Sequence, residues 1–216
     1  MVGVDRCFFY SLNFRVFVDV ISHAIIGAIV AQFCLWKMDD SSKRKKLVVV
    51  GALLAAAPDI TNIPLYLHLG AINERFLWIP YHSDWDGYRV EYPMLVIGWE
   101  ITHSLVIAAL VGYILYRKKY ALWPILCWAS HLFVDVLTHT GEWSSVPLWP
   151  VYFKMEGFSD PWKWSPSAWL FSNVVLFVVF YLISKYMESW RINYSNCLLP
   201  VEAWYQGWES SHDAQG

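Results

Sequence analysis

Apolar residues in this chain are gathered into stretches about as long as a helix that crosses a lipid bilayer. None of the stretches alternates apolar and polar residues with a period of two, which disfavours strands. Because lipid offers no hydrogen bonds to an exposed backbone, they predict an all-α, polytopic membrane helical bundle of about five transmembrane helices. The stretches run from Phe17 to Trp36, Leu47 to about Leu67, Met94 to Tyr116, Tyr120 to about Thr138, and Ala168 to Met187.

The composition supports this fold class and excludes several others. Of the 216 residues, 57% are apolar and 16% are charged, whereas soluble domains are about half apolar and about a quarter charged. The net charge of −2 excludes a basic surface for nucleic acid. The chain is too apolar for intrinsic disorder, and its four widely spaced cysteines form no disulfide framework. The alternative is a very hydrophobic soluble all-α protein, which the bilayer-length stretches disfavour.

Basic residues in the short loops predict the orientation of the bundle. The segment 43–46 (Lys-Arg-Lys-Lys) follows the first stretch, and 117–119 (Arg-Lys-Lys) follows the third. Short basic loops stay in the cytoplasm, so we expect the N-terminus outside the inner (plasma) membrane of the cell. The resulting assignments are loops 68–93 and 139–167 outside, a membrane-embedded domain over 1–187, and a cytoplasmic or interfacial tail over 188–216.

Ionisable residues lie inside the apolar stretches, where each is costly and needs a reason. With the orientation above, they all fall in the outer half of the membrane. Because that orientation is deduced from Lys and Arg alone, this agreement is independent of it. His131 and Asp135 stand one helical turn apart, which lets both bind one metal ion or lets one orient the other. Histidine and aspartate without thiolate suit zinc, manganese or iron(II), with zinc the first choice.

These residues predict a metal site of one to three ions built from four helices. One such residue alone is more often hydrogen-bonded between helices than bound to a metal. Five of them on four helices favour a metal site instead. Asp19 is expected to orient His23, and Glu100 is a ligand, a general base or a rim residue. The predicted ligands are His23, Asp59, His103, His131 and Asp135. Candidate extra ligands are His139 and Glu142. The histidines without partners at ligand spacing are His68, His82 and His212.

Short motifs follow one another between residues 23 and 150. They are His23 with Gly27, Pro58-Asp59-Ile60, Thr102-His103-Ser104, Ser130-His131-Leu132-x-x-Asp135-x-x-Thr138, then Gly141 and Pro147-Leu148-Trp149-Pro150. In this order they resemble the YdjM-like membrane-bound metal-dependent hydrolases, distant relatives of zinc-dependent phospholipase C. The resemblance implies an all-α bundle with a principal metal on Asp59, His103, His131 and Asp135, and a second metal on His23, with Asp135 as the candidate shared ligand.

Two positions depart from the pattern of that family. Thr61 stands where the family has a second Asp, and Gly98-Trp99-Glu100 stands where it has His-Arg-Gly. Glu100 is therefore a candidate replacement for a lost ligand. The alternative is that one metal site is weakened or absent.

The residues and the resemblance together predict an enzyme. Metal-activated water would cleave a phosphoester of a membrane lipid or lipid-linked substrate, with Glu100 or Asp59 as the catalytic carboxylate. The depth of the site favours a lipid partner, and no nucleic acid is expected. One alternative is a metal or proton relay or transport protein, which the scarcity of polar residues in the cytoplasmic halves disfavours. Another is a non-catalytic adaptor with a structural metal site.

Overall fold

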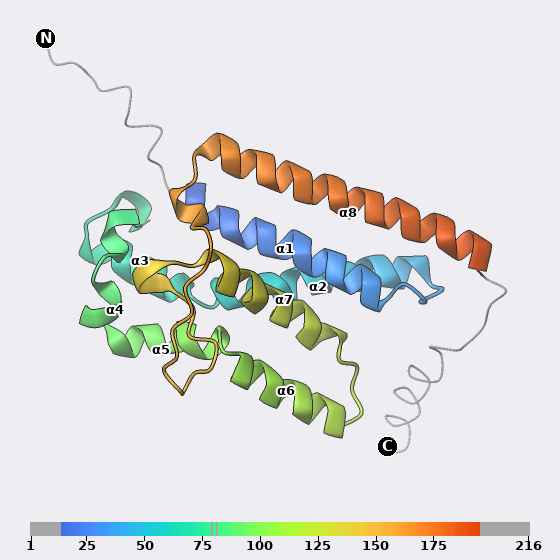
Figure 1. The fold of residues 1–216 in the computed structure, drawn as a ribbon, viewed down its shortest axis with the longest axis horizontal. Helices are drawn as coiled ribbons and strands as arrows, with labels where there is room; N and C mark the ends of the chain where they lie inside the picture. The colour runs from blue at the N-terminus through green and yellow to red at the C-terminus, as the bar shows by residue number, and fades with distance from the viewer. Residues whose placement is uncertain (1–13, 79, 81, 195–216) are drawn as a thin grey trace, which may run out of the picture.

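The computed structural model describes residues 14–78, 80 and 82–194 (Figure 1). Within that part of the chain the regular secondary structure consists of helices. An isolated β-bridge pairs Ser145 with Met155, and the described residues form no strand. The all-α prediction is confirmed. The α-helices are α1 (Phe14–Cys34), α2 (Ser41–Ile60), α3 (Ile63–Ile72), α4 (Tyr88–Glu91), α5 (Pro93–Thr102), α6 (Leu105–Arg117), α7 (Trp123–Thr138) and α8 (Pro166–Tyr194); short 3-10 turns are η1 (Phe76–Trp78), η2 (His82–Trp85), η3 (Gly141–Trp143) and η4 (Pro161–Lys163).

Each predicted stretch contains helix, but the helices differ in their capacity to cross a bilayer. Two segments are long and apolar enough, Ser41–Ile72 and Ser167–Ser189, and the bent pair of α5 and α6 makes a third when counted as one span. Val20–Cys34 and Trp123–Thr138 are apolar but shorter. A helical membrane protein is thus supported, while the number of five spans and the external N-terminus stay predictions. Most of the predicted tail, beyond Tyr194, lies outside the described residues.

The third predicted stretch is divided at His103 and Ser104, where α5 and α6 meet at a bend of 46°. Ser104 has extended backbone (φ −95°, ψ 124°), and its hydroxyl accepts from the Ile107 N–H at 3.3 Å. A serine in this conformation is a favourable N-cap, so α6 begins anew rather than continuing α5. The break places His103 at the junction of the two helices.

Small residues let α1 and α2 approach closely. A Cβ atom added at Gly27 would lie 2.3 Å from the Ala55 Cβ and 2.7 Å from the Gly51 carbonyl oxygen. Close packing through small residues is typical of helices in membranes. Helix α1 also packs against α7 and α8, so it lies at the centre of the bundle (Figure 1).

Aromatic residues gather at one end of the molecule, where α3, α4 and α5 meet. Their buried cluster holds Leu65, Leu69, Trp85, Tyr88, Val96, Trp99 and Trp143. Burial raises the pKa of Tyr88 to about 12, and its hydroxyl lies 2.7 Å from the Nδ1 of His68. The connections from α1 to α2 and from α6 to α7 lie together at the opposite end (Figure 1). The two basic segments used to predict orientation therefore share one end of the bundle.

Candidate metal centre

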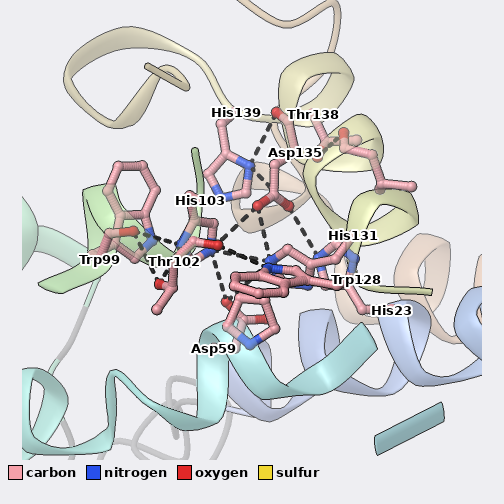
Figure 2. A network of polar contacts seen from close by, with 12 residues as sticks. His23, Asp59, Trp99, Thr102, His103, Trp128, His131, Asp135, Thr138 and His139 are labelled. Carbon is pink, nitrogen blue, oxygen red and sulfur yellow. Dashed lines mark hydrogen bonds and ion pairs between the residues drawn. The ribbon is translucent and has the colours of Figure 1, made fainter. Parts of the chain in front are cut away.

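Four separate parts of the fold contribute the predicted ligands (Figure 2). Helix α1 carries His23, α2 carries Asp59, the α5–α6 junction carries His103, and α7 carries both His131 and Asp135. His23 and His131 are completely buried, and Asp135 and His103 are 1% and 4% exposed. The one-turn spacing on α7 directs His131 and Asp135 to the same side, as the sequence predicted.

One group of potential ligands consists of His23, His131 and Asp135. The two carboxylate oxygens of Asp135 face different rings: Oδ1 lies 3.1 Å from the His23 Nε2, and Oδ2 lies 3.0 Å from the His131 Nε2. The two imidazole rings are 3.8 Å apart between centroids. One ligand atom from each residue lies within 4.8 Å of the others, which is close enough for a shared metal ion.

The second group consists of Asp59, His103 and His131, and it meets the same 4.8 Å criterion. Here the Nε2 atoms of His103 and His131 are 3.0 Å apart. The Asp59 Oδ1 lies 3.6 Å from the first and 3.8 Å from the second. Because His131 belongs to both groups, and the Asp135 Oδ2 is also 3.3 Å from the His103 Nε2, the five residues form one continuous cluster.

The donor atoms of this cluster fit a divalent cation. The Oδ2 of Asp59 and both oxygens of Asp135 are buried and accept no hydrogen bond in the structure. Buried carboxylates are tolerated only with compensating charge or coordination. Imidazole nitrogen and carboxylate oxygen without thiolate are ligands that zinc accepts, and they suit manganese and iron(II) as well. The geometry agrees with the predicted metal site and does not specify which metal it takes.

His103 is held by groups outside the cluster. Its Nδ1 lies 2.8 Å from the Trp99 carbonyl oxygen, and its ring stacks on the Trp99 indole at 4.6 Å and 24°. An Nδ1–H that donates to this carbonyl leaves the Nε2 lone pair directed at the cluster, the usual arrangement for a metal-binding histidine. The Trp128 Nε1 donates to the Thr102 carbonyl at 2.9 Å and so fixes the same junction. Sequence reasoning missed these supports, although the four-residue spacing of Trp99 and His103 was a usable signal.

The remaining predicted residues lie beside the cluster or away from it. The Nδ1 of buried His139 is 3.6 Å from the Asp135 Oδ1, yet His139 is in neither metal-capable group. The Glu100 carboxylate is paired with the Nη2 of Arg89 at 2.7 Å, and the Glu142 carboxylate accepts from the Gly87 N–H at 2.9 Å. Asp19 lies on α1 one turn before His23, and its side chain is outside the described part of the structure.

Arg89 is a buried residue that the sequence did not indicate. Its Nη1 donates to the Glu142 carbonyl at 2.9 Å and lies 3.3 Å from the Ser144 carbonyl. Its guanidinium also lies 5.2 Å from the centre of the Trp99 ring. Arg89 lies on α4, and its ion pair to Glu100 links it to α5. Its hydrogen bonds to the Glu142 and Ser144 carbonyls link it to η3 and the residue that follows. An arginine in a polar loop carries no sequence pattern that distinguishes this role from a solvated one.

Comparison with known proteins identifies one family. The family model of the YdjM inner membrane protein matches residues 18–192, which include all five members of the cluster. Neither the curated proteins nor the solved structures gave a match. Since the family model covers most of the chain, the protein belongs to the YdjM inner membrane protein family.

Proposed function

We propose that this protein is a membrane-embedded metal-dependent hydrolase that cleaves a phosphoester of a lipid or lipid-linked substrate. The observation that carries the proposal is the clustering of three imidazoles and two carboxylates, from four parts of the fold, in two metal-capable groups that share His131 (Figure 2). Carboxylate oxygens that accept no hydrogen bond at such a point favour a cation over a purely structural polar cluster.

Two overlapping sets of residues would hold the metal. His23, His131 and Asp135 would bind one ion, and Asp59, His103 and His131 would bind another or share the first. We propose zinc because these ligands suit it and it is the commonest choice for hydrolysis. When bound, a divalent cation would lower the pKa of a coordinated water and polarise the bond to be cleaved.

Asp59 is our candidate for the proton acceptor. Its side chain is 12% exposed, whereas those of His131 and Asp135 are 0% and 2% exposed, so it is the most accessible of the three. Its Oδ2 is buried and accepts no hydrogen bond, so that oxygen would be able to take a proton from a water held inside the cluster. Glu100 is the second candidate, and its ion pair with Arg89 favours a positioning role for it.

The proposed substrate follows from the surroundings of the cluster. The family is one of inner membrane proteins, and the cluster lies among the helices of the bundle. A water-soluble substrate would have to leave its hydration shell to reach such a site, whereas a lipid-linked one is already in the membrane. We further propose that the site is reached from the extracytoplasmic side, since the basic connections lie at the far end of the bundle (Figure 1).

A phosphoesterase assay on the full-length protein in lipid nanodiscs tests the proposal. The wild type, depleted of metal and then supplied with zinc, should release phosphate or a phosphorylated headgroup from a panel of phospholipids. Asp59→Asn should abolish release, because the amide cannot accept the proton. Asp86→Asn, a change at an exposed aspartate outside the cluster, is the matched control and should retain activity.

The burial of His23 and His131 favours a second candidate, a metal site that only stabilises the bundle. Closed coordination by protein ligands is typical of structural sites, whereas a catalytic site keeps a position open for water. Stoichiometric zinc with no turnover of any phosphoester, together with loss of stability on chelation, would favour this candidate and contradict the hydrolase proposal.

A further inference from the structure

A short loop beyond α7 carries several exposed apolar side chains. This segment, which we name the 146–154 loop, is closed at its base by the bridge between Ser145 and Met155, where the Met155 N–H donates to the Ser145 carbonyl at 2.8 Å. Residues before the loop are buried, but Val151, Tyr152 and Phe153 at its tip are 66%, 65% and 52% exposed. The loop is thus anchored at its base and presents its apolar tip outward.

The loop is fastened to the break between α5 and α6. The Leu105 N–H donates to the Pro147 carbonyl at 2.9 Å, and the Ser104 hydroxyl donates to the Trp149 carbonyl at 2.8 Å. These two carbonyls satisfy donors at the start of α6 that have no partner within the helix. Non-helical backbone can lie at membrane depth only where protein groups satisfy its hydrogen bonds. Here the loop and the helix break hydrogen-bond to each other.

The base of the loop lies beside an exposed apolar helix surface. The bent α5–α6 pair is a candidate membrane span, and Leu105 and Val106 beside the loop are 38% and 42% exposed. At the tip, the Tyr152 ring lies 5.8 Å from the Arg89 guanidinium. Figure 1 shows the loop descending from the end of α7 across α5, at the same end of the molecule as the start of α8. That level is the bilayer interface if α8 spans the membrane.

The residue types at the tip indicate its partner. Burying an apolar side chain such as Val or Phe is favourable relative to leaving it in water. Contiguous exposed apolar residues mark sites that contact a membrane or a protein, and Trp and Tyr beside them are typical of the membrane interface. Trp149 and Tyr152 provide those two residue types within the loop.

We propose that the 146–154 loop inserts its tip, through Val151 and Phe153, into the bilayer leaflet at the end of the molecule where α8 begins. The partner is the phospholipid leaflet itself. Insertion holds Ser104, and with it the neighbouring His103, at a fixed depth relative to the lipid headgroups. The proposal stands independently of hydrolysis, since it concerns a surface outside the metal-capable cluster.

Site-directed spin labelling of the full chain in nanodiscs tests this proposal. Single cysteines Val151→Cys and Phe153→Cys are made in a background whose four native cysteines are replaced by alanine. Val178→Cys on the exposed face of α8 gives the lipid reference, and Lys163→Cys, whose native side chain is 65% exposed, gives the water reference. We expect the spin labels at both loop positions to be more accessible to oxygen than to a water-soluble nickel chelate, like the label at position 178. The opposite preference, or protection from both reagents by a second protein copy, would overturn the proposal.

A second measurement covers the case in which the cysteine-free background does not fold. Wild-type protein is reconstituted with a phospholipid that carries a photoactivatable group on its acyl chain, and the adducts are mapped by peptide sequencing. Adducts on both α8 and the 146–154 loop are expected. Labelling of α8 without labelling of the loop would overturn the proposal.

Discussion

Asp135 connects the two halves of the candidate metal centre. Its Oδ1 faces His23 and His139, and its Oδ2 faces His131 and His103, at distances between 3.0 and 3.6 Å. The nearest polar neighbours of both oxygens are imidazole nitrogens. A carboxylate buried to this degree requires a positive partner, which a bound cation would supply.

We therefore predict that Asp135→Asn loses metal from the group formed by His23, His131 and Asp135. Changes to groups that merely support a ligand weaken metal binding by about 10–100-fold, and removal of a ligand itself should exceed that range. Metal content per protein after dialysis, measured by plasma mass spectrometry, checks the prediction. Asp86→Asn is the control. Wild-type metal content in Asp135→Asn would exclude Asp135 as a ligand.

Glu100 gives the sharpest contrast between sequence and structure among the site residues. Its carboxylate pairs with Arg89, and both side chains are largely buried, at 12% and 7% exposed. Breaking a buried pair by removing one charge costs about 3–5 kcal/mol, and we expect the lower part of that range here because Glu100 is partly accessible.

Glu100→Gln should accordingly lower the thermal unfolding temperature while the protein keeps its metal. The measurements are thermal unfolding in one detergent and metal content of the same sample. Glu91→Gln, at an exposed position in the same region, should change neither quantity. Loss of metal with unchanged stability would show instead that Glu100 is a ligand.

The sequence predicted the five members of the cluster but not the residues that support them. Histidine and aspartate inside apolar stretches are conspicuous because each is costly there. Arg89 and Trp99 are not conspicuous, since arginine is ordinary in a loop and tryptophan is ordinary near a membrane interface. Their roles depend on contacts between α4, α5 and η3, which no local pattern encodes.

At the scale of elements, the close contact between α1 and α2 constrains the packing of the bundle. Gly27→Ala would place a Cβ atom against the Ala55 Cβ and the Gly51 carbonyl, so the helices must separate. Overpacking of this kind costs about 1–3 kcal/mol. Gly98→Ala is the matched control, because an added Cβ there meets nothing within 4 Å. We expect the unfolding temperature to fall for Gly27→Ala and to stay or rise slightly for Gly98→Ala. Equal effects would contradict the packing described.

The helices were predictable from the sequence, and their breaks were not. Apolar residues outnumber the polar Glu100, Thr102, His103 and Ser104 between Met94 and Tyr116, so average hydropathy alone describes a single span there. The break at Ser104 depends on a cap within α6 and on hydrogen bonds from a loop more than forty residues away. Pro58 and the polar pair Thr61 and Asn62 were clearer local signals for the end of α2.

At the scale of the whole molecule, the basic segments and the metal-capable cluster set the expected topology. Lys43–Lys46 at the start of α2 and Arg117–Lys119 at the end of α6 lie at the end of the molecule opposite α3 and α4 (Figure 1). The positive-inside rule then predicts that the α3–α4 end faces outward from the cell membrane.

Cysteine labelling in intact cells checks this topology. In a cysteine-free background, Glu91→Cys should react with a membrane-impermeant maleimide added outside, and Lys119→Cys should react only after the cells are permeabilised. Both native residues are exposed, so access is not limited by packing. The reverse pattern would place the N-terminus inside and contradict the extracytoplasmic site.

X-ray absorption at the zinc edge, on full-length protein purified with zinc, tests the central claim most directly. We predict stoichiometric zinc whose first shell contains only nitrogen and oxygen, at about 2.0–2.2 Å, with multiple-scattering features of imidazole from at least two of His23, His103 and His131. Absence of stoichiometric metal, or a shell with sulfur at about 2.3 Å, would contradict a His and Asp metal centre.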